Sequence, residues 1–185
     1  MKKLTKKKLT ATILGFCLYT GAVIGQISEG GVPFSFIAEQ KHSFSGKEAG
    51  KIVIQEPDLT PIHAEDLQND AQQKVYRVGL RLPFVADISS GHWESVENKV
   101  DLWRLTIQCD NALALGLYFS DAVQIPEGGK LFAYSGNKKH VVGAFSHETD
   151  GFEALRMIAG DVLTLEYSAP AGTSLPTINI SELVY

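Results

Sequence analysis

The chain has 185 residues, of which 44% are hydrophobic and 21% charged, so it has the composition of a folded protein rather than a disordered one. Its 17 basic and 21 acidic residues give a formal net charge of −4. That charge argues against a nucleic-acid-binding protein, which needs a dense basic face, and the length fits one domain or two at most.

The first 25 residues have the pattern of a secretory signal peptide. They carry five lysines and no acidic residue, and an apolar run extends from Leu9 to Ile24. Val23 and Gly25 stand at positions −3 and −1 before Gln26, so we expect cleavage between Gly25 and Gln26. The run is shorter than the roughly 20 residues that cross a bilayer. We therefore expect a secreted, periplasmic or cell-surface protein with no stable membrane anchor.

Cleavage would change both the charge and the cysteine count. It would leave 12 basic and 21 acidic residues, a net charge near −9, which is further from that of a protein that binds nucleic acid or anionic membranes. It would also remove Cys17, whose use as a lipidation site is disfavoured by the bulky Phe16 before it. Cys109 would remain alone, and its place on an alternating apolar face predicts a buried thiol rather than an intermolecular disulfide.

Residues 26–73 are expected to form an extended N-terminal segment with little regular structure. Gln26 to Gly50 is rich in glycine, serine and charged residues and has only short apolar patches. Lys51–Ile54 is a candidate short strand, ended by Pro57, and Ala64–Leu67 is a candidate helical turn.

From residue 74 onward, apolar and polar residues alternate with a period of two, as in half-buried strands. Turn-forming clusters of glycine, asparagine and proline separate these stretches, and no helical period is evident. Since one sheet cannot bury its apolar face alone, we predict for residues 74–185 an all-β fold, a two-sheet antiparallel β-sandwich of the jelly-roll type. In residues 74–82, one apolar face of the expected strand would be formed by Tyr76, Val78, Leu80 and Leu82. In residues 101–109, it would be formed by Trp103, Leu105, Ile107 and Cys109. Further strands are expected near residues 113–119, 130–134, 139–145, 152–157, 161–167 and 177–184.

The sequence holds no complete catalytic motif. It lacks a Gly-x-Ser-x-Gly elbow and a Gly-Asp-Ser-Gly-Gly stretch, either of which would mark a serine nucleophile. His63 with Asp66 and His147 with Asp150 are spaced as pairs, and we interpret both as solvated loop residues. The alternative is a small hydrolase that uses His147 with Asp150, so the question of enzymatic activity stays open.

No cofactor is expected. The sequence lacks Cys-x-x-Cys and His-Glu-x-x-His motifs, and a pairing of His140 with His147 would lack a third zinc ligand. Calcium remains an alternative, because carboxylate oxygens suit that ion, although aspartate is also common in turns. The aspartates near expected strand ends are Asp110, Asp121, Asp150 and Asp161.

Several short motifs follow one another in a specific order in the second half of the chain. They are Ser90–Trp93, Leu102–Ile107, Ala112–Ser120, Ile125–Tyr134, Val142–Phe145, Ala159–Asp161, Leu163–Tyr167, Ile178–Ile180 and Leu183–Tyr185. In this order they resemble the N-terminal, non-catalytic domain of secreted trypsin-like serine endopeptidases of the lysyl endopeptidase type from Bacteroidetes-like bacteria. In that family the catalytic His, Asp and Ser lie downstream of this domain, so no catalytic residue is carried over.

The resemblance implies a propeptide-like domain that assists the folding of a serine peptidase domain or masks it. Residues near the end of the sequence would then face that partner, namely Ile178, Ile180, Leu183 and Tyr185. The alternative is an exported carbohydrate- or surface-binding sandwich, which would need Trp93, Tyr118 or Tyr134 to face solvent.

Overall fold

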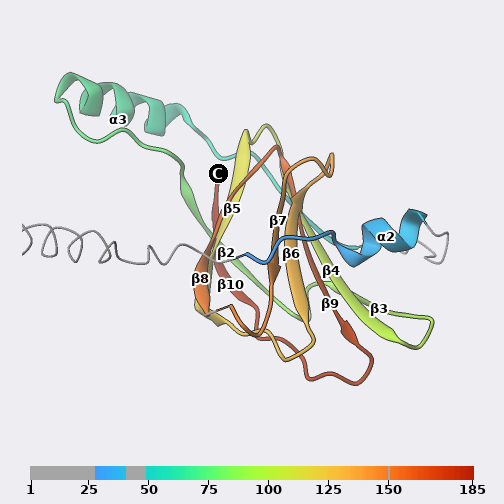
Figure 1. Ribbon diagram of the computed structural model, residues 1–185. Helices are drawn as coiled ribbons and strands as arrows, with labels where there is room; N and C mark the ends of the chain where they lie inside the picture. The colour runs from blue at the N-terminus through green and yellow to red at the C-terminus, as the bar shows by residue number, and fades with distance from the viewer. Residues whose placement is uncertain (1–27, 41–48, 150) are drawn as a thin grey trace, which may run out of the picture.

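The computed structural model describes residues 28–40, 49–149 and 151–185 (Figure 1). In this part of the chain ten strands form two sheets that face each other, which confirms the expected β-sandwich. The predicted signal peptide, with Gly25 and Gln26, lies outside the described residues. Neither described helix has the length and hydropathy that a membrane crossing requires.

The larger sheet has six strands in the order β1-β4-β9-β6-β7, and β3 pairs with β4 beside β1. The smaller sheet has the order β2-β10-β5-β8. All neighbours are antiparallel except β1 and β4, which run parallel with Gly50 opposite Leu105. The strands are β1 (Gly50–Ile54), β2 (Arg81–Asp87), β3 (His92–Val96), β4 (Val100–Cys109), β5 (Ala114–Val123), β6 (Lys130–Ser135), β7 (Val141–Phe145), β8 (Phe152–Ala159), β9 (Val162–Pro170) and β10 (Asn179–Val184).

The core lies between the two sheets and is built from the alternating residues of their inner faces. On β4 the predicted face is confirmed, because Trp103, Leu105, Ile107 and Cys109 are all fully buried. Cys109 is buried, as predicted, and burial raises the pKa of its thiol. This apolar packing is the main source of stability in such a fold.

Trp103 is packed so tightly that only a glycine fits beside it. The indole N–H donates a hydrogen bond to the carbonyl oxygen of Ile88 at 2.8 Å. A Cβ atom added to Gly91 would lie 2.3 Å from the indole nitrogen, far inside van der Waals contact. Gly91 therefore lets the chain entering β3 pass directly over the buried ring.

Residues 26–73 contain more regular structure than we expected from the sequence. They include α2 (Phe34–Gln40), β1 and α3 (Thr60–Ala71). The strand β1 confirms the candidate strand at Lys51–Ile54, and α3 contains the candidate turn at Ala64–Leu67 but is longer, whereas α2 was not predicted. Because β1 pairs along the whole of its length with β4, the sandwich also includes residues before position 74. Sequence alone did not reveal this pairing, since a single short strand gains its order from a distant partner.

Residues 28–40 form a strap over the outer face of the six-stranded sheet. The backbone N–H of Glu29 donates to the Ala144 oxygen at 2.9 Å, and the N–H of Ala144 donates to the Gly30 oxygen at 3.0 Å. Within α2, the Phe36 ring packs edge-on against Tyr134 with 4.8 Å between ring centroids. The strap therefore covers a face that would otherwise leave aromatic side chains exposed.

The expected strand at residues 74–82 is present only from Arg81 onward. Tyr76 and Val78, assigned to its buried face, are 76% and 86% exposed. Leu80 pairs with Tyr185 through two backbone hydrogen bonds, but residues 74–79 have no neighbouring strand on which to pack, so their alternation produces no buried face.

Candidate functional site

Residues 55–80 leave the sandwich as an arm that carries α3 and returns to β2, as Figure 1 shows. None of the residues of α3 is buried. Helices in proteins usually depend on packing an apolar face against the rest of the fold. Because α3 lacks such packing in the described structure, the arm offers accessible surface rather than core.

Local interactions explain where α3 begins and ends. Pro61 stands in the first turn, where its missing N–H is not needed. The Asp58 carboxylate accepts the N–H of Thr60 at 2.9 Å, and this hydrogen bond lowers the pKa of Asp58. After Ala71, Gln73 has a φ of 55°, a left-handed conformation that ends the helix.

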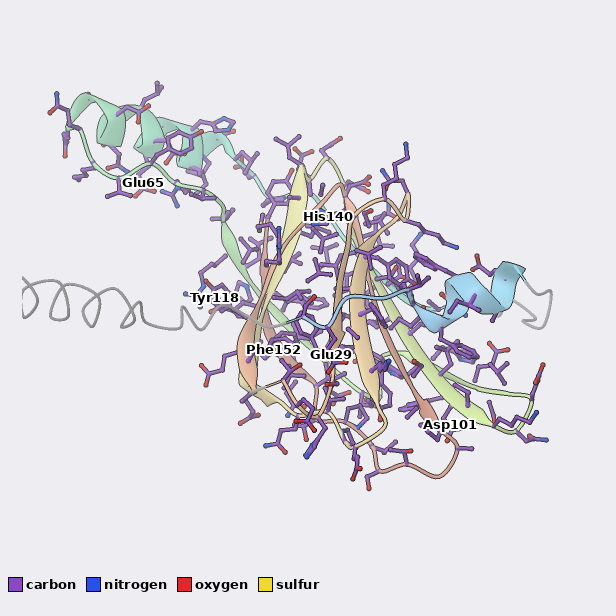
Figure 2. The ribbon with its side chains drawn as sticks, viewed as in Figure 1. Glu29, Glu65, Asp101, Tyr118, His140 and Phe152 are labelled. Carbon is purple, nitrogen blue, oxygen red and sulfur yellow. The ribbon has the colours of Figure 1, made fainter. Side chains whose placement is uncertain are left out.

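The return of the arm toward β2 is tied to α3 by Arg77. Its Nε donates to Asp66 at 2.9 Å and its Nη2 donates to Glu65 at 2.5 Å (Figure 2 shows Glu65 on the arm). These hydrogen bonds raise the pKa of Arg77. The N–H of Lys74 also donates to the Asn69 oxygen at 3.0 Å. The arm thus consists of one helix and one irregular returning segment, held together by their own contacts.

Exposed apolar side chains are concentrated on this arm. Leu67 of α3 is 72% exposed and Val75 is 94% exposed, in addition to Tyr76 and Val78. Leu113, on the neighbouring edge of the sandwich, is 91% exposed and precedes β5 rather than lying within it as predicted. Several large exposed apolar side chains on one segment are a feature of surfaces that bind another macromolecule.

A pocket of about 390 Å³ lies between the arm and the sandwich. Ile62 and Val78 line it from the arm, and Leu113, Met157 and Tyr185 line it from the sandwich. Leu80 and Tyr185 exchange two backbone hydrogen bonds of 2.7 and 2.8 Å, so Tyr185 lies at the base of the arm. Both parts of the fold therefore supply apolar walls to the pocket, and ionisable side chains of the arm, such as Asp66 and Arg77, also line it.

The residues predicted to face a partner near the end of the sequence are mostly core residues. Ile178, Ile180 and Leu183 are 2% exposed or less, so our expectation is wrong for these three. The physical reason is that β10 lies inside its sheet, between β2 and β5, and its Ile180 and Leu183 belong to the core, as does Ile178 just before the strand. Tyr185 is partly exposed and lines the pocket beside the arm.

The predicted histidine–aspartate pairs are not brought together into a catalytic arrangement that the structure describes. On α3, the Asp66 carboxylate accepts a hydrogen bond from Arg77, while the His63 side chain is exposed. His147 places its Nδ1 atom 3.3 Å from the Ile125 oxygen, and Asp150 lies outside the described residues.

Metal ligands are not clustered in the described part of the chain. No group of three or more histidine, cysteine, aspartate or glutamate side chains there could hold a metal ion. Of the aspartates considered for calcium, Asp110 accepts a hydrogen bond from Gln108 and Asp121 accepts one from Asn179.

Of the three aromatic residues considered for sugar binding, Tyr118 is the most accessible, at 36% exposed (Figure 2). The Arg81 guanidinium lies over its ring, 4.2 Å from the centroid. Trp93 packs edge-on against Tyr167, and Tyr134 is buried beneath the strap. The described structure therefore has no flat row formed by these three rings.

The most polar buried group is the Glu166 carboxylate on β9, which is fully buried. The backbone N–H of Ser35 donates to Oε1 at 2.9 Å, and the hydroxyls of Ser35 and Tyr134 donate to Oε2 at 2.5 and 2.9 Å. Burial raises the pKa of Tyr134, and the charge of Glu166 raises it further. Ser35 is 1% exposed, so this cluster fastens the strap and gives no access to a substrate.

Sequence reasoning missed the arm as a candidate binding surface. Its apolar residues alternate in residues 74–82, and this alternation was interpreted as the buried face of a strand. The adjacent residues Val75 and Tyr76 gave a signal against a strand, because neighbours on a strand cannot both face the core.

Comparison of this chain with protein-family models, with curated proteins and with solved structures finds no match to any of them.

Proposed function

We propose that this protein is an exported, non-catalytic β-sandwich that binds a trypsin-like serine peptidase domain and assists its folding or masks its active site. The exposed apolar arm is the observation that supports this proposal. Leu67, Val75, Tyr76 and Val78 all lie on a segment that contributes nothing to the described core. When a partner covers a surface of this kind, apolar side chains leave contact with water, and this lowers the free energy of the complex.

Binding would act on the partner by mass action. A protein that binds the native state of a peptidase domain, and not its unfolded state, shifts the folding equilibrium of that domain toward the native state. The arm carries five acidic and two basic residues, and the chain without its first 25 residues would have a charge near −9. Complementary charge at the rim of an interface mainly increases the rate of association, so we propose a partner with a basic surface.

The position of Tyr185 fits a partner on the same polypeptide as well as a separate one. Tyr185 pairs with Leu80 at the base of the arm. A domain joined to Tyr185 would therefore begin next to the exposed apolar side chains, and a short connection would suffice for it to reach them.

Refolding of the peptidase domain tests this proposal. A denatured peptidase domain of the lysyl endopeptidase type is diluted with or without the full chain, and the recovered activity and the inhibition of native enzyme are measured. We expect the chain to change at least one of them and Val78→Ser to weaken that effect. Val85→Ser is the matched control, because Val85 on β2 is 89% exposed and lies outside the arm. An unchanged yield together with unchanged activity would contradict the proposal.

Carbohydrate binding is the second candidate, and a pocket on the outer face of the four-stranded sheet favours it. The pocket has a volume of about 540 Å³ and is lined by Tyr118, Arg81 and Arg156. Aromatic rings beside polar groups are suited to sugar recognition. Titration calorimetry with soluble glycans, with Tyr118→Ala as the comparison, would detect such binding.

A further inference from the structure

One face of α3 lines the pocket of about 390 Å³ that lies between the arm and the sandwich. The residues on this face are Leu59, Ile62, His63 and Asp66, and Leu59 immediately precedes the helix. Their spacing of three, four and seven residues places them on one side of a helix. Leu67 of the same helix is 72% exposed and does not line the pocket. A defined stripe of α3 therefore forms this wall, and the volume is in the range of small-molecule sites.

The opposite wall of the pocket comes from the sandwich and is largely apolar. It includes Leu113 and Ala114 at the start of β5 and Met157 on β8. Ile62 and Val78 contribute apolar side chains from the arm. A ligand with an apolar body would therefore contact apolar atoms of both parts of the fold, and their removal from water would favour binding.

Glu56 brings a negative charge to the lining of this pocket. Its carboxylate accepts a hydrogen bond from Nδ2 of Asn111 at 2.6 Å. No basic side chain in the described part of the chain forms an ion pair with it. Burial raises the pKa of the Tyr185 hydroxyl, and the charge of Glu56 raises it further, so the two groups lie close together. This hydroxyl donates to the Asp110 oxygen at 3.4 Å and can itself accept a hydrogen bond.

The charges around the pocket favour a cationic ligand over an anionic one. The basic side chains among the lining residues are His63 and Arg77. The Arg77 guanidinium is already held by Glu65 and Asp66, so an anion would have to compete with both carboxylates. A cation can instead bind Glu56 without breaking an ion pair. Hydrogen bonds between an ammonium group and a carboxylate are also stronger than those between neutral groups.

We propose that this pocket binds a small amphipathic cation, a compound with an apolar body and a primary ammonium group. The ammonium group contacts the carboxylate of Glu56, and the apolar body packs between Ile62 of the arm and Met157 of the sandwich. Such a ligand would give α3 the packing against the sandwich that helices usually require. The inference involves no peptidase, so its failure would leave the proposed function untouched.

Titration calorimetry of the full chain with three probes of equal chain length tests the sign of the ligand charge. The probes are octylammonium, octan-1-ol and octanoate, at about pH 8, where an amine is protonated and a histidine side chain is ordinarily neutral. We expect octylammonium to bind at least about tenfold more tightly than octan-1-ol, a difference of about 1.4 kcal/mol, and octanoate to bind most weakly. Equal affinities for octylammonium and octan-1-ol, or no binding of octylammonium, would overturn the inference.

Two pairs of variants locate the bound probe. Glu56→Gln keeps an acceptor for Asn111 and removes the charge, so it should weaken octylammonium binding about tenfold and leave octan-1-ol binding unchanged. Its matched control is Glu153→Gln, at an exposed carboxylate of β8 that does not line the pocket. Ile62→Ala should weaken both probes at least about threefold, whereas Leu67→Ala on the same helix should weaken neither. An unchanged affinity of Glu56→Gln or Ile62→Ala for octylammonium would place the probe elsewhere and refute the proposal.

Hydrogen exchange distinguishes binding in the pocket from adsorption to the exposed apolar side chains of the arm. With free octylammonium at about ten times its Kd, amides within residues 60–71 should exchange up to about tenfold more slowly, because the ligand binds only where α3 faces the sandwich. Octanoate at the same concentration is the control and should leave this exchange unchanged. If octylammonium slowed exchange only at Val75 and Tyr76, the probe would be adsorbed outside the pocket and the inference would be wrong.

Discussion

Replacing Glu166 with alanine should loosen the strap and lower the stability of the whole fold. The substitution removes the acceptor of three hydrogen bonds, from the Ser35 N–H and from the hydroxyls of Ser35 and Tyr134. A buried donor left without an acceptor costs about 1–3 kcal/mol. Both hydroxyls can rotate toward other acceptors, so we take the low end for each donor and expect a loss of about 3 kcal/mol in the free energy of unfolding.

Urea denaturation followed by tryptophan fluorescence measures this loss, and thermal denaturation should show a midpoint lowered by about 6–12 °C for a chain of this size. Hydrogen exchange should also show faster exchange of the Ser35 amide. The control is Tyr134→Phe, which removes one of the three donors and should cost about 1 kcal/mol. If Glu166→Ala changed the free energy of unfolding by less than about 0.5 kcal/mol, the reasoning that the strap depends on this carboxylate would be refuted.

Three further predictions concern pH, the arm and the core. Because the pKa of Tyr134 is raised in the folded protein, its hydroxyl loses its proton at a lower pH in the unfolded chain than in the folded one. The free energy of unfolding should therefore fall above pH 10, the ordinary pKa of tyrosine, by up to about 1.4 kcal/mol per pH unit. Tyr134→Phe should reduce this slope in urea titrations at pH 9–12. Leu67→Ala on the arm should change the free energy of unfolding by less than about 0.5 kcal/mol, whereas Leu165→Ala in the core should lower it by about 2–5 kcal/mol. Equal losses for the two variants would contradict the description of the arm as a segment outside the core. Gly91→Ala should force the Trp103 ring to move, at a cost of about 1–3 kcal/mol and with an altered near-ultraviolet circular dichroism signal, and an unchanged spectrum would argue against the close contact.

The sandwich could be predicted because its strands carry their burial pattern in the sequence. The alternation of Asp101–Cys109 predicted β4, which the structure extends by one residue to Val100. Such a pattern reports which side chains are buried, and it is reliable where a strand has a core on one side. Tyr76 and Val78 fit the same alternation, but there it does not indicate burial, because no neighbouring element covers these side chains.

Features that depend on distant partners could not be predicted. The pattern of Ile178 and Ile180 is the same in an edge strand as in an inner one, and only the pairing of β10 with β2 and β5 decides between them. Glu166 alternates outward from the core of β9, so its sequence position suggests contact with water. Its burial follows from the strap, whose Ser35 lies 131 residues earlier in the chain.

The place of β10 in its sheet constrains when this protein can fold. β10 follows the other nine described strands in the chain, yet β2 and β5 are connected only through it. A polypeptide that emerges from the ribosome with its N-terminus first can therefore complete the four-stranded sheet only when residues 179–184 become available. For a protein exported through a narrow channel, as proposed here, the four-stranded sheet would stay incomplete until residues 179–184 have been synthesised, and an incomplete sheet is easier to keep unfolded for export.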